Sequence, residues 1–186
     1  MQQKPPKVEL IIAGVGGQGV LFAGQMLAQA GLRKYRYVSY MPSYGVEKRG
    51  GPSECTLVLS DEPVSSPVLD QAQTVMLLDS SQAKMFEGRV RPGGTMIVEK
   101  TGLDFKPTRA DLHVKPVSGL EIAMGMGGAV VNNLIMLGVY AELMKPVAPE
   151  IILEEIERKS GDRTELRERN RAAFNRGLAL GRMLAA

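Results

Sequence analysis

The chain has 186 residues, of which 44% are apolar and 23% are charged, and its formal net charge is +3. This composition is typical of a soluble globular domain with a sizeable core, and the charge is too small to indicate nucleic-acid binding. No apolar run approaches the roughly 20 residues that span a bilayer. The single cysteine can form neither an internal disulfide nor an iron–sulfur site. We therefore expect a cytoplasmic protein that binds neither nucleic acid nor a membrane.

The predicted elements begin with a short apolar run, bounded by proline and glycine, that indicates a buried strand over 7–13. An amphipathic helix is predicted over 17–31 and a second strand over 35–39. Residues 40–52 form a long predicted loop, and loops of that length are often functional. The remaining predicted strands are 53–59, 74–78, 95–98 and 112–114. A turn at Gly93-Gly94 is predicted before the strand 95–98. The remaining predicted helices are 81–87, 118–124, 128–144, 149–159 and 164–184.

Strands and helices alternate over the first two thirds of the chain. This pattern predicts an α/β fold with a mostly parallel, Rossmann-like sheet and helices on both faces. No repeat or composition break divides the sequence, so we expect residues 1–186 to form a single domain, with residues 1–6 disordered. Ligands of such sheets bind at the carboxyl ends of the strands. The segment that follows the first strand and the 40–52 loop are therefore expected to meet there.

The segment after the first strand is a glycine-rich turn. Gly14, Gly16 and Gly19 satisfy the pattern G-x-G-x-x-G, with Gly17 and Gln18 between them. Such a turn can present backbone N–H groups to a phosphate at a helix N-terminus. A nicotinamide dinucleotide site also needs an acid about 20 residues further on, at the end of the second strand. That acid is missing, because the first one after the motif is Glu47. The turn therefore indicates either close helix–strand packing or a contact with another anion or cofactor.

A second candidate site lies in the predicted loop, where Arg49 precedes the pair Gly50 and Gly51. A guanidinium on a flexible glycine pair can bind a phosphate or carboxylate through two hydrogen bonds. The alternative is an ordinary solvated charged loop. Because the glycine turn is expected nearby, we favour a functional role for these residues.

Asn132 and Asn133 lie inside the predicted apolar helix 128–144, and buried amides need hydrogen-bond partners. They are expected to bond locally, to cap backbone near the glycine turn, or to face another subunit. The predicted helix 164–184 carries several arginines interleaved with glutamates. We interpret it as a solvated face with i, i+4 ion pairs.

Taken in order, these motifs resemble those of a known family. The run Gly14-Val15-Gly16-Gly17-Gln18-Gly19, the downstream Arg49-Gly50-Gly51 and the late Asn133 with Leu137-Gly138 resemble the gamma subunit of 2-oxoacid:ferredoxin oxidoreductases. That family acts on pyruvate, 2-oxoglutarate or ketoisovalerate. The match runs over about residues 7–180.

The resemblance implies a subunit, inactive alone, of a complex that oxidatively decarboxylates a 2-oxoacid to an acyl-CoA and passes electrons to ferredoxin. It implies that thiamine diphosphate, Mg²⁺ and iron–sulfur clusters are held by partner subunits, with coenzyme A as a substrate of the complex. The implied partners are alpha and beta subunits, with a ferredoxin-like delta subunit as a further candidate, and an isolated chain could form a homodimer.

The sharper hypothesis is that the glycine turn, the Arg49-Gly50-Gly51 segment and Asn133 line a groove for coenzyme A phosphates or for part of a cofactor site between subunits. Two alternatives stay open at this point. One is a stand-alone reductase that binds a nucleotide or flavin, and the other is a subunit of an indolepyruvate oxidoreductase. The sequence does not identify the 2-oxoacid.

Overall fold

A buried strand, β1 (Val8–Val15), lies inside a six-stranded sheet with the order β2-β3-β1-β4-β5-β6. The computed structural model describes residues 6–43 and 51–185 of the chain. The other strands are β2 (Tyr37–Ser43), β3 (Pro52–Ser60), β4 (Ala72–Leu77), β5 (Val90–Glu99) and β6 (His113–Val117). β1 pairs in parallel with β4, β4 with β5, and β5 with β6. The predicted mostly parallel sheet is confirmed.

One strand runs against the others. β3 pairs antiparallel with both β1 and β2, so it separates these two strands, which themselves point the same way. The sequence pattern did not predict this reversal. Because β3 is antiparallel to β1, the start of β3 lies beside the end of β1, with Pro52 opposite Val15.

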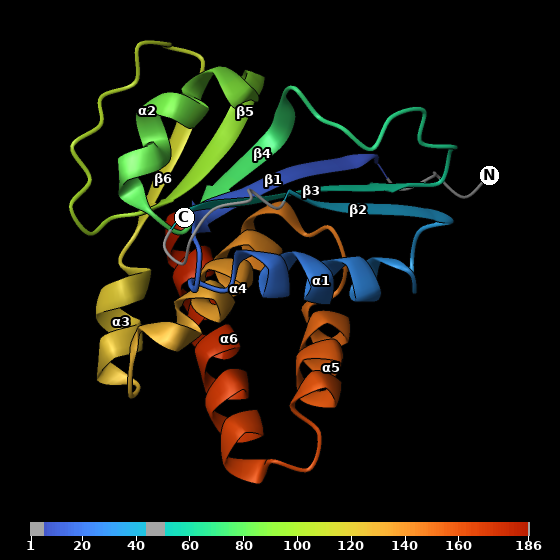
Figure 1. Cartoon of the computed structure of the whole chain (residues 1–186), viewed down its shortest axis with the longest axis vertical. Coiled ribbons are helices and arrows are strands. Elements are labelled where there is room, and N and C mark those ends of the chain that lie inside the picture. Colours follow the sequence, from blue (N-terminus) through green and yellow to red (C-terminus); the bar gives the residue numbers. More distant parts are fainter. Residues whose placement is uncertain (1–5, 44–50, 186) are drawn as a thin grey trace.

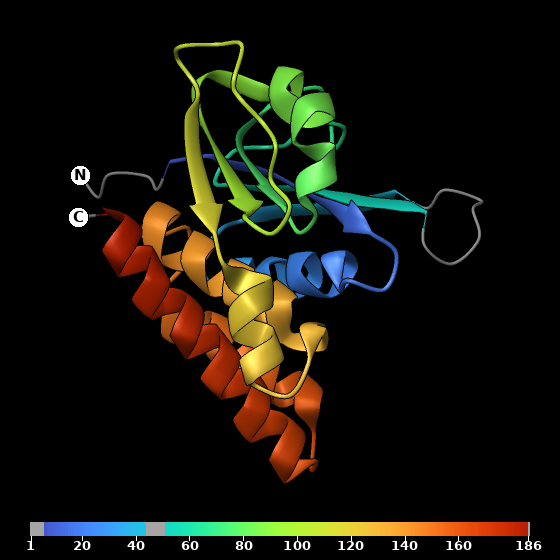
Figure 2. The ribbon, with the colours of Figure 1, turned by 90° about the vertical axis from the view of Figure 1, so that its left-hand side faces the viewer.

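Helices cover both faces of the sheet, as predicted (Figures 1 and 2). One side carries α1 (Val20–Gly31), α4 (Asn132–Met144), α5 (Pro149–Ser160) and α6 (Thr164–Ala185), and α3 (Gly119–Gly125) links β6 to this layer. The opposite side carries the short α2 (Ala83–Phe86), flanked by the 3-10 turns η1 (Ser80–Gln82) and η2 (Glu87–Arg89). No helix within residues 6–43 and 51–185 is long and apolar enough to cross a membrane.

The side chains of β1 alternate between two hydrophobic clusters, as the two-residue period of a strand requires. Leu10 and Ile12 belong to the larger cluster, which contains the helices α1, α4, α5 and α6. Ile11 belongs to the smaller cluster on the opposite face, together with Ala83 and Phe86. Because both faces of β1 are covered, the strand reads in the sequence as a continuous apolar run.

Several predicted boundaries were wrong. β2 continues to Ser43, well into the predicted 40–52 loop, because Pro42 lies on an edge strand, where a missing N–H is tolerated. The predicted Gly93-Gly94 turn lies within β5, where the pairing with β4 shifts register. The predicted helix 128–144 is divided into η3 (Ala129–Val131) and α4.

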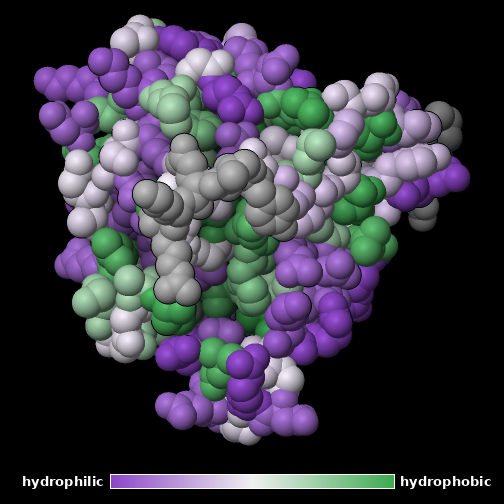
Figure 3. Space-filling view, viewed as in Figure 1, coloured by the Kyte–Doolittle hydropathy of each residue, from purple (hydrophilic) through white to green (hydrophobic). Residues whose placement is uncertain are grey.

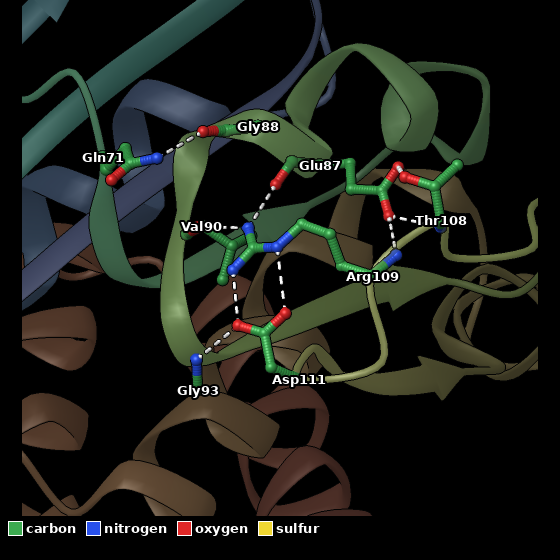
Figure 4. Close-up of polar contacts among 8 residues, drawn as sticks. All are labelled: Gln71, Glu87, Gly88, Val90, Gly93, Thr108, Arg109 and Asp111. Carbon is green, nitrogen blue, oxygen red and sulfur yellow. Dashed lines mark hydrogen bonds and ion pairs between the residues drawn. The ribbon is translucent and has the colours of Figure 1, made fainter.

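Charged side chains join the amino-terminal ends of the parallel strands (Figure 4). The Glu87 carboxylate accepts hydrogen bonds from the backbone N–H groups of Thr108 and Arg109 and from the Thr108 hydroxyl. The Arg109 guanidinium donates to the carbonyls of Glu87 and Val90 and to the Asp111 carboxylate. Asp111 also accepts from the Gly93 N–H at 2.8 Å. This network fixes the long connection between β5 and β6 against η2.

Candidate functional site

The glycine turn joins the carboxyl end of β1 to α1. Gly17 and Gly19 have positive φ values of 98° and 80°, which residues with a side chain rarely adopt. The Gln18 N–H donates to the Val15 carbonyl at 3.1 Å and closes the turn. Because of this backbone path, α1 begins at Val20 rather than at residue 17, where the sequence pattern placed it.

Gln18 is hydrogen-bonded within the turn and to Asp79, which lies just beyond β4. Its Oε1 accepts from the Val15 N–H at 2.8 Å, and its Nε2 donates to Asp79 Oδ2 at 3.1 Å. The Gln18 side chain packs directly over Gly14, where an added Cβ would lie 2.5 Å from Gln18 Oε1. Gln18 therefore connects the end of β1 to Asp79, two residues beyond β4.

Asp79 carries negative charge beside the turn. The Ser81 hydroxyl is the main cause that lowers the pKa of the Asp79 carboxyl, and the Gln18 amide adds to it against an opposing effect of burial. The carboxylate is therefore ionised near neutral pH. An anion would consequently be repelled on the Asp79 side of the turn and would have to approach from another direction.

Asn133 links the turn to α4. Its Nδ2 donates to the Gly19 carbonyl at 3.2 Å, and its Oδ1 accepts from the Leu134 N–H at 2.9 Å. A Cβ on Gly19 would collide with the Asn133 amide. The expectation that these asparagines contact backbone near the glycine turn is confirmed for Asn133. The Asn132 amide oxygen is buried and has no hydrogen-bond partner among the described residues.

Gly51 meets the glycine turn, as the predicted convergence at the carboxyl ends of the strands requires. The Gly16 N–H donates to the Gly51 carbonyl at 2.8 Å. The predictions for Arg49 and Gly50 lie outside the described residues. Gly14, Gly16, Gly17, Gln18, Gly19, Gly51 and Asn133 are thus brought together, whereas their role in binding stays a prediction.

The topology agrees with the sequence argument against a dinucleotide site. In a Rossmann unit the second parallel strand lies next to the first, and the acid at its end reaches the ribose. Here the neighbour of β1 on that side is the antiparallel β3. The end of β2 lies one strand further out, at Ser43.

A cleft of about 270 Å³ opens between the glycine turn, α1, α4 and α6. Its lining includes Gly17, Gly19, Phe22, Asn133, Leu166 and Arg169. Apolar side chains gather where α1 and α4 lie, and polar side chains predominate at the end where α5 and α6 meet (Figure 3). Among the described residues that line it, the cleft has an apolar wall and one cation, Arg169.

The contribution of α6 was not predicted. Its arginines were interpreted as a solvated face with i, i+4 ion pairs. Arg171, Arg176 and Arg182 are exposed, as that interpretation expects, but the ion pairs of Arg171 and Arg182 join α6 to other helices. Arg171 pairs with Glu157 of α5 and Arg182 with Glu142 of α4, whereas Arg169 lines the cleft. The signal was present in the sequence, because Leu166 and Arg169 fall on the helical stripe that continues through the buried Ala173 and Phe174.

The one cysteine does not fit an iron–sulfur cluster. Cys55 lies buried on β3, its thiol donates weakly to the Val20 carbonyl at 3.8 Å, and burial raises its pKa to about 12. The thiolate is the form that ligates metals, and clusters take several cysteines. No group of three or more histidine, cysteine, aspartate or glutamate side chains is placed to hold a metal ion in the part of the chain that the structure describes.

A protein-family model described as pyruvate ferredoxin/flavodoxin oxidoreductase matches residues 9–180. The chain belongs to this family. The matched range runs from the second residue of β1 to within five residues of the end of α6, and it therefore contains the whole glycine turn and the cleft beside it.

Two curated relatives of this family member are subunits of 2-oxoacid oxidoreductases. The ketoisovalerate oxidoreductase subunit VorA of Methanothermobacter thermautotrophicus is 39% identical over 138 residues, or 74% of the chain, and the chain spans only 28% of that relative's length. The 2-oxoglutarate synthase subunit KorC of Methanothermobacter marburgensis is 30% identical over 179 residues, which cover 92% of the chain and 95% of that subunit.

A solved structure shares the fold. It is the 2-oxoglutarate:ferredoxin oxidoreductase from Magnetococcus marinus with 2-oxoglutarate, coenzyme A and succinyl-CoA bound. The likeness has a TM-score of 0.86 at 22% identity and covers 98% of this chain but 32% of the other. At that identity the comparison establishes the arrangement of strands and helices.

Proposed function

We propose that this chain is a gamma-type subunit of a multi-subunit 2-oxoacid:ferredoxin oxidoreductase. Such a complex oxidatively decarboxylates a 2-oxoacid to an acyl-CoA and passes the electrons to ferredoxin. The observation that carries the proposal is the 30% identity to a 2-oxoglutarate synthase subunit over nearly the full length of both chains. The chain alone is proposed to be inactive.

Under this proposal the redox cofactors belong to other subunits. Thiamine diphosphate, Mg²⁺ and the iron–sulfur clusters are assigned to alpha and beta subunits, with a ferredoxin-like delta subunit as a further candidate. The buried, protonated Cys55 supports this division, because it offers no thiolate. A cytoplasmic location and a homodimer of the isolated chain belong to the same proposal.

The test is co-purification of the tagged chain from its native cells under anaerobic conditions. The eluate is assayed for coenzyme A-dependent reduction of a viologen dye by pyruvate, 2-oxoglutarate, ketoisovalerate and indolepyruvate. We expect larger subunits and activity with one of these acids, which would also identify the substrate. A lone chain that carries a nucleotide or flavin and shows no activity would overturn the proposal and support the stand-alone reductase.

We further propose that Gly16, Gly17, Gln18 and Gly19, together with Arg49, line a groove for the phosphates of coenzyme A. The turn lies at the start of α1, where backbone N–H groups favour anions. Arg49 lies two residues before Gly51, whose carbonyl is bonded to Gly16. The Magnetococcus enzyme with the same fold has coenzyme A bound, which supports this choice of ligand.

Arg49→Ala in the purified complex tests the groove. We expect the KM for coenzyme A to rise about tenfold, because a charge-assisted hydrogen bond to a phosphate is lost. Arg36→Ala is the matched control, since Arg36 is exposed and lies on the segment before β2. If Arg49→Ala weakens assembly and leaves the kinetics of assembled complexes unchanged, the segment serves the subunit interface instead.

A further inference from the structure

Arg169 has no polar partner among the described residues. It is half-buried on α6, and its Nε is shielded from solvent with no hydrogen-bond partner among the described residues. Arg171 pairs with Glu157, and a terminal nitrogen of Arg167 donates to the Gly161 carbonyl, although the Nε of Arg167 is also buried without a partner among the described residues. Of these three arginines only Arg169 lines the cleft. A guanidinium that is partly removed from water is stabilised when an anion supplies the missing hydrogen bonds.

The surroundings of Arg169 are apolar. Phe22, Val130, Leu134 and Leu166 line the same cleft, and Val130 is 61% exposed. Large apolar side chains that stay open to solvent beside a cleft are typical of a binding surface. The cleft can therefore bind an oxyanion through Arg169 and the apolar part of the same ligand against its apolar wall.

The size and charge of the cleft limit its ligand further. A volume of about 270 Å³ is just below the range of drug-sized pockets, roughly 300–1,000 Å³, so the cleft takes a small molecule or one end of a larger one. The ionised Asp79 is bonded to Gln18, and neither residue lines the cleft. Among the described lining residues the charge is therefore positive, from Arg169.

We propose that this cleft binds an amphipathic oxyanion. The phosphate or carboxylate bonds to Arg169, and the apolar or aromatic body lies against Phe22, Leu134 and Leu166. The site shares Gly17 and Gly19 with the proposed coenzyme A groove, but its binding group is Arg169 rather than Arg49, and its binding is measured on the chain itself. It therefore stands or fails independently of the proposed place in an oxidoreductase complex.

Binding to the full chain is measured with four probes. AMP and hexanoate carry an oxyanion and a body, whereas inorganic phosphate lacks the body and adenosine lacks the oxyanion. We expect AMP or hexanoate to bind at least about tenfold more tightly than phosphate and adenosine, because both parts of the cleft are then used. The probe that binds identifies the oxyanion as a phosphate or a carboxylate.

Arg169→Gln is expected to raise the Kd of that probe about tenfold or more, since a charge-assisted hydrogen bond is lost. Arg176→Gln is the matched control, because Arg176 is exposed on the same helix. In the unsubstituted chain, the methyl NMR signals of Val130 and Leu134 should shift with the probe, whereas that of the exposed Met85 on α2 should not. Equal effects of the two substitutions, or no shift at Val130 and Leu134, would overturn the proposal.

Discussion

The two ends of the parallel strands are built from different chemistry. At the carboxyl ends, backbone conformation at Gly17 and Gly19 and the amide of Asn133 shape the turn. At the amino ends, the side chains of Glu87, Arg109 and Asp111 bind one another and the backbone (Figure 4).

The difference lies in what is left unpaired. Glu87 and Asp111 accept bonds from several donors each, so the amino end is a closed network that fixes a connection. Beside the carboxyl end, Arg169 Nε has no partner in the described part of the chain, and an open cleft adjoins it. Buried polar groups are normally satisfied. The Nε of Arg167 is also buried without a partner in the described residues, but of these two arginines only Arg169 lines the cleft, where a ligand could supply the bond.

Gly19→Ala should have the largest effect, because it acts on both the backbone and the packing. The positive φ disfavours any side chain by about 1–2 kcal/mol, and the new methyl group would displace the Asn133 amide. We expect the free energy of unfolding to fall by about 2–5 kcal/mol in urea denaturation. An unchanged urea midpoint would show that the turn is not held by its contact with α4.

Gly17→Ala separates the two causes. Gly17 also has a positive φ, but an added Cβ would meet nothing within 4 Å. We therefore expect a loss of about 1–2 kcal/mol, from backbone strain alone. If the two substitutions cost the same, the contact between Gly19 and Asn133 contributes nothing.

Glu87→Ala addresses the amino end. It removes the carboxylate that accepts hydrogen bonds from the backbone N–H groups of Thr108 and Arg109. Partly buried N–H groups that lose their acceptor lower the free energy of unfolding. We expect a loss of about 1–3 kcal/mol of unfolding free energy, with Glu87→Gln losing less because one acceptor oxygen stays. The folded variant should bind AMP or hexanoate as tightly as the unsubstituted chain does. A changed Kd would show that the amino end of the sheet also affects the cleft.

The sequence predicted the elements of the site better than their boundaries. An apolar run followed by glycines identified β1, the turn and α1, since those residues leave few other conformations. Their exact limits depend on tertiary context. Pro42 suggests a loop, but it lies within β2. A proline is tolerated there because β2 is an edge strand, and only the sheet order shows this.

Residues that meet across the fold were harder to predict. Asn133 could be expected to need a partner, but its bond to Gly19 spans 114 positions of sequence, and no local pattern identifies that partner. Arg169 was assigned to the solvated face of α6 because arginine is usually exposed. Helix packing decides which face of α6 borders the cleft. The only sequence signal for that face is the helical spacing of apolar residues from Leu166 to Phe174.

Acid should affect the two ends to different extents, and this is the smallest expected effect. The Arg109 guanidinium, helped by the Gly93 N–H, lowers the pKa of Asp111 to about 2. The ordinary value is about 3.9, so the contribution of this carboxylate to stability is complete above that pH and is lost as the pH falls through about 2. We therefore expect the urea midpoint of the chain to fall between pH 4 and pH 2, and Asp111→Asn to fall less over that range. The same comparison with Asp79→Asn measures how much of the acid-induced loss of stability comes from the carboxyl end, because the pKa of Asp79 is also lowered. If Asp111→Asn and the unsubstituted chain lose the same stability, the salt bridge to Arg109 does not hold the amino end together.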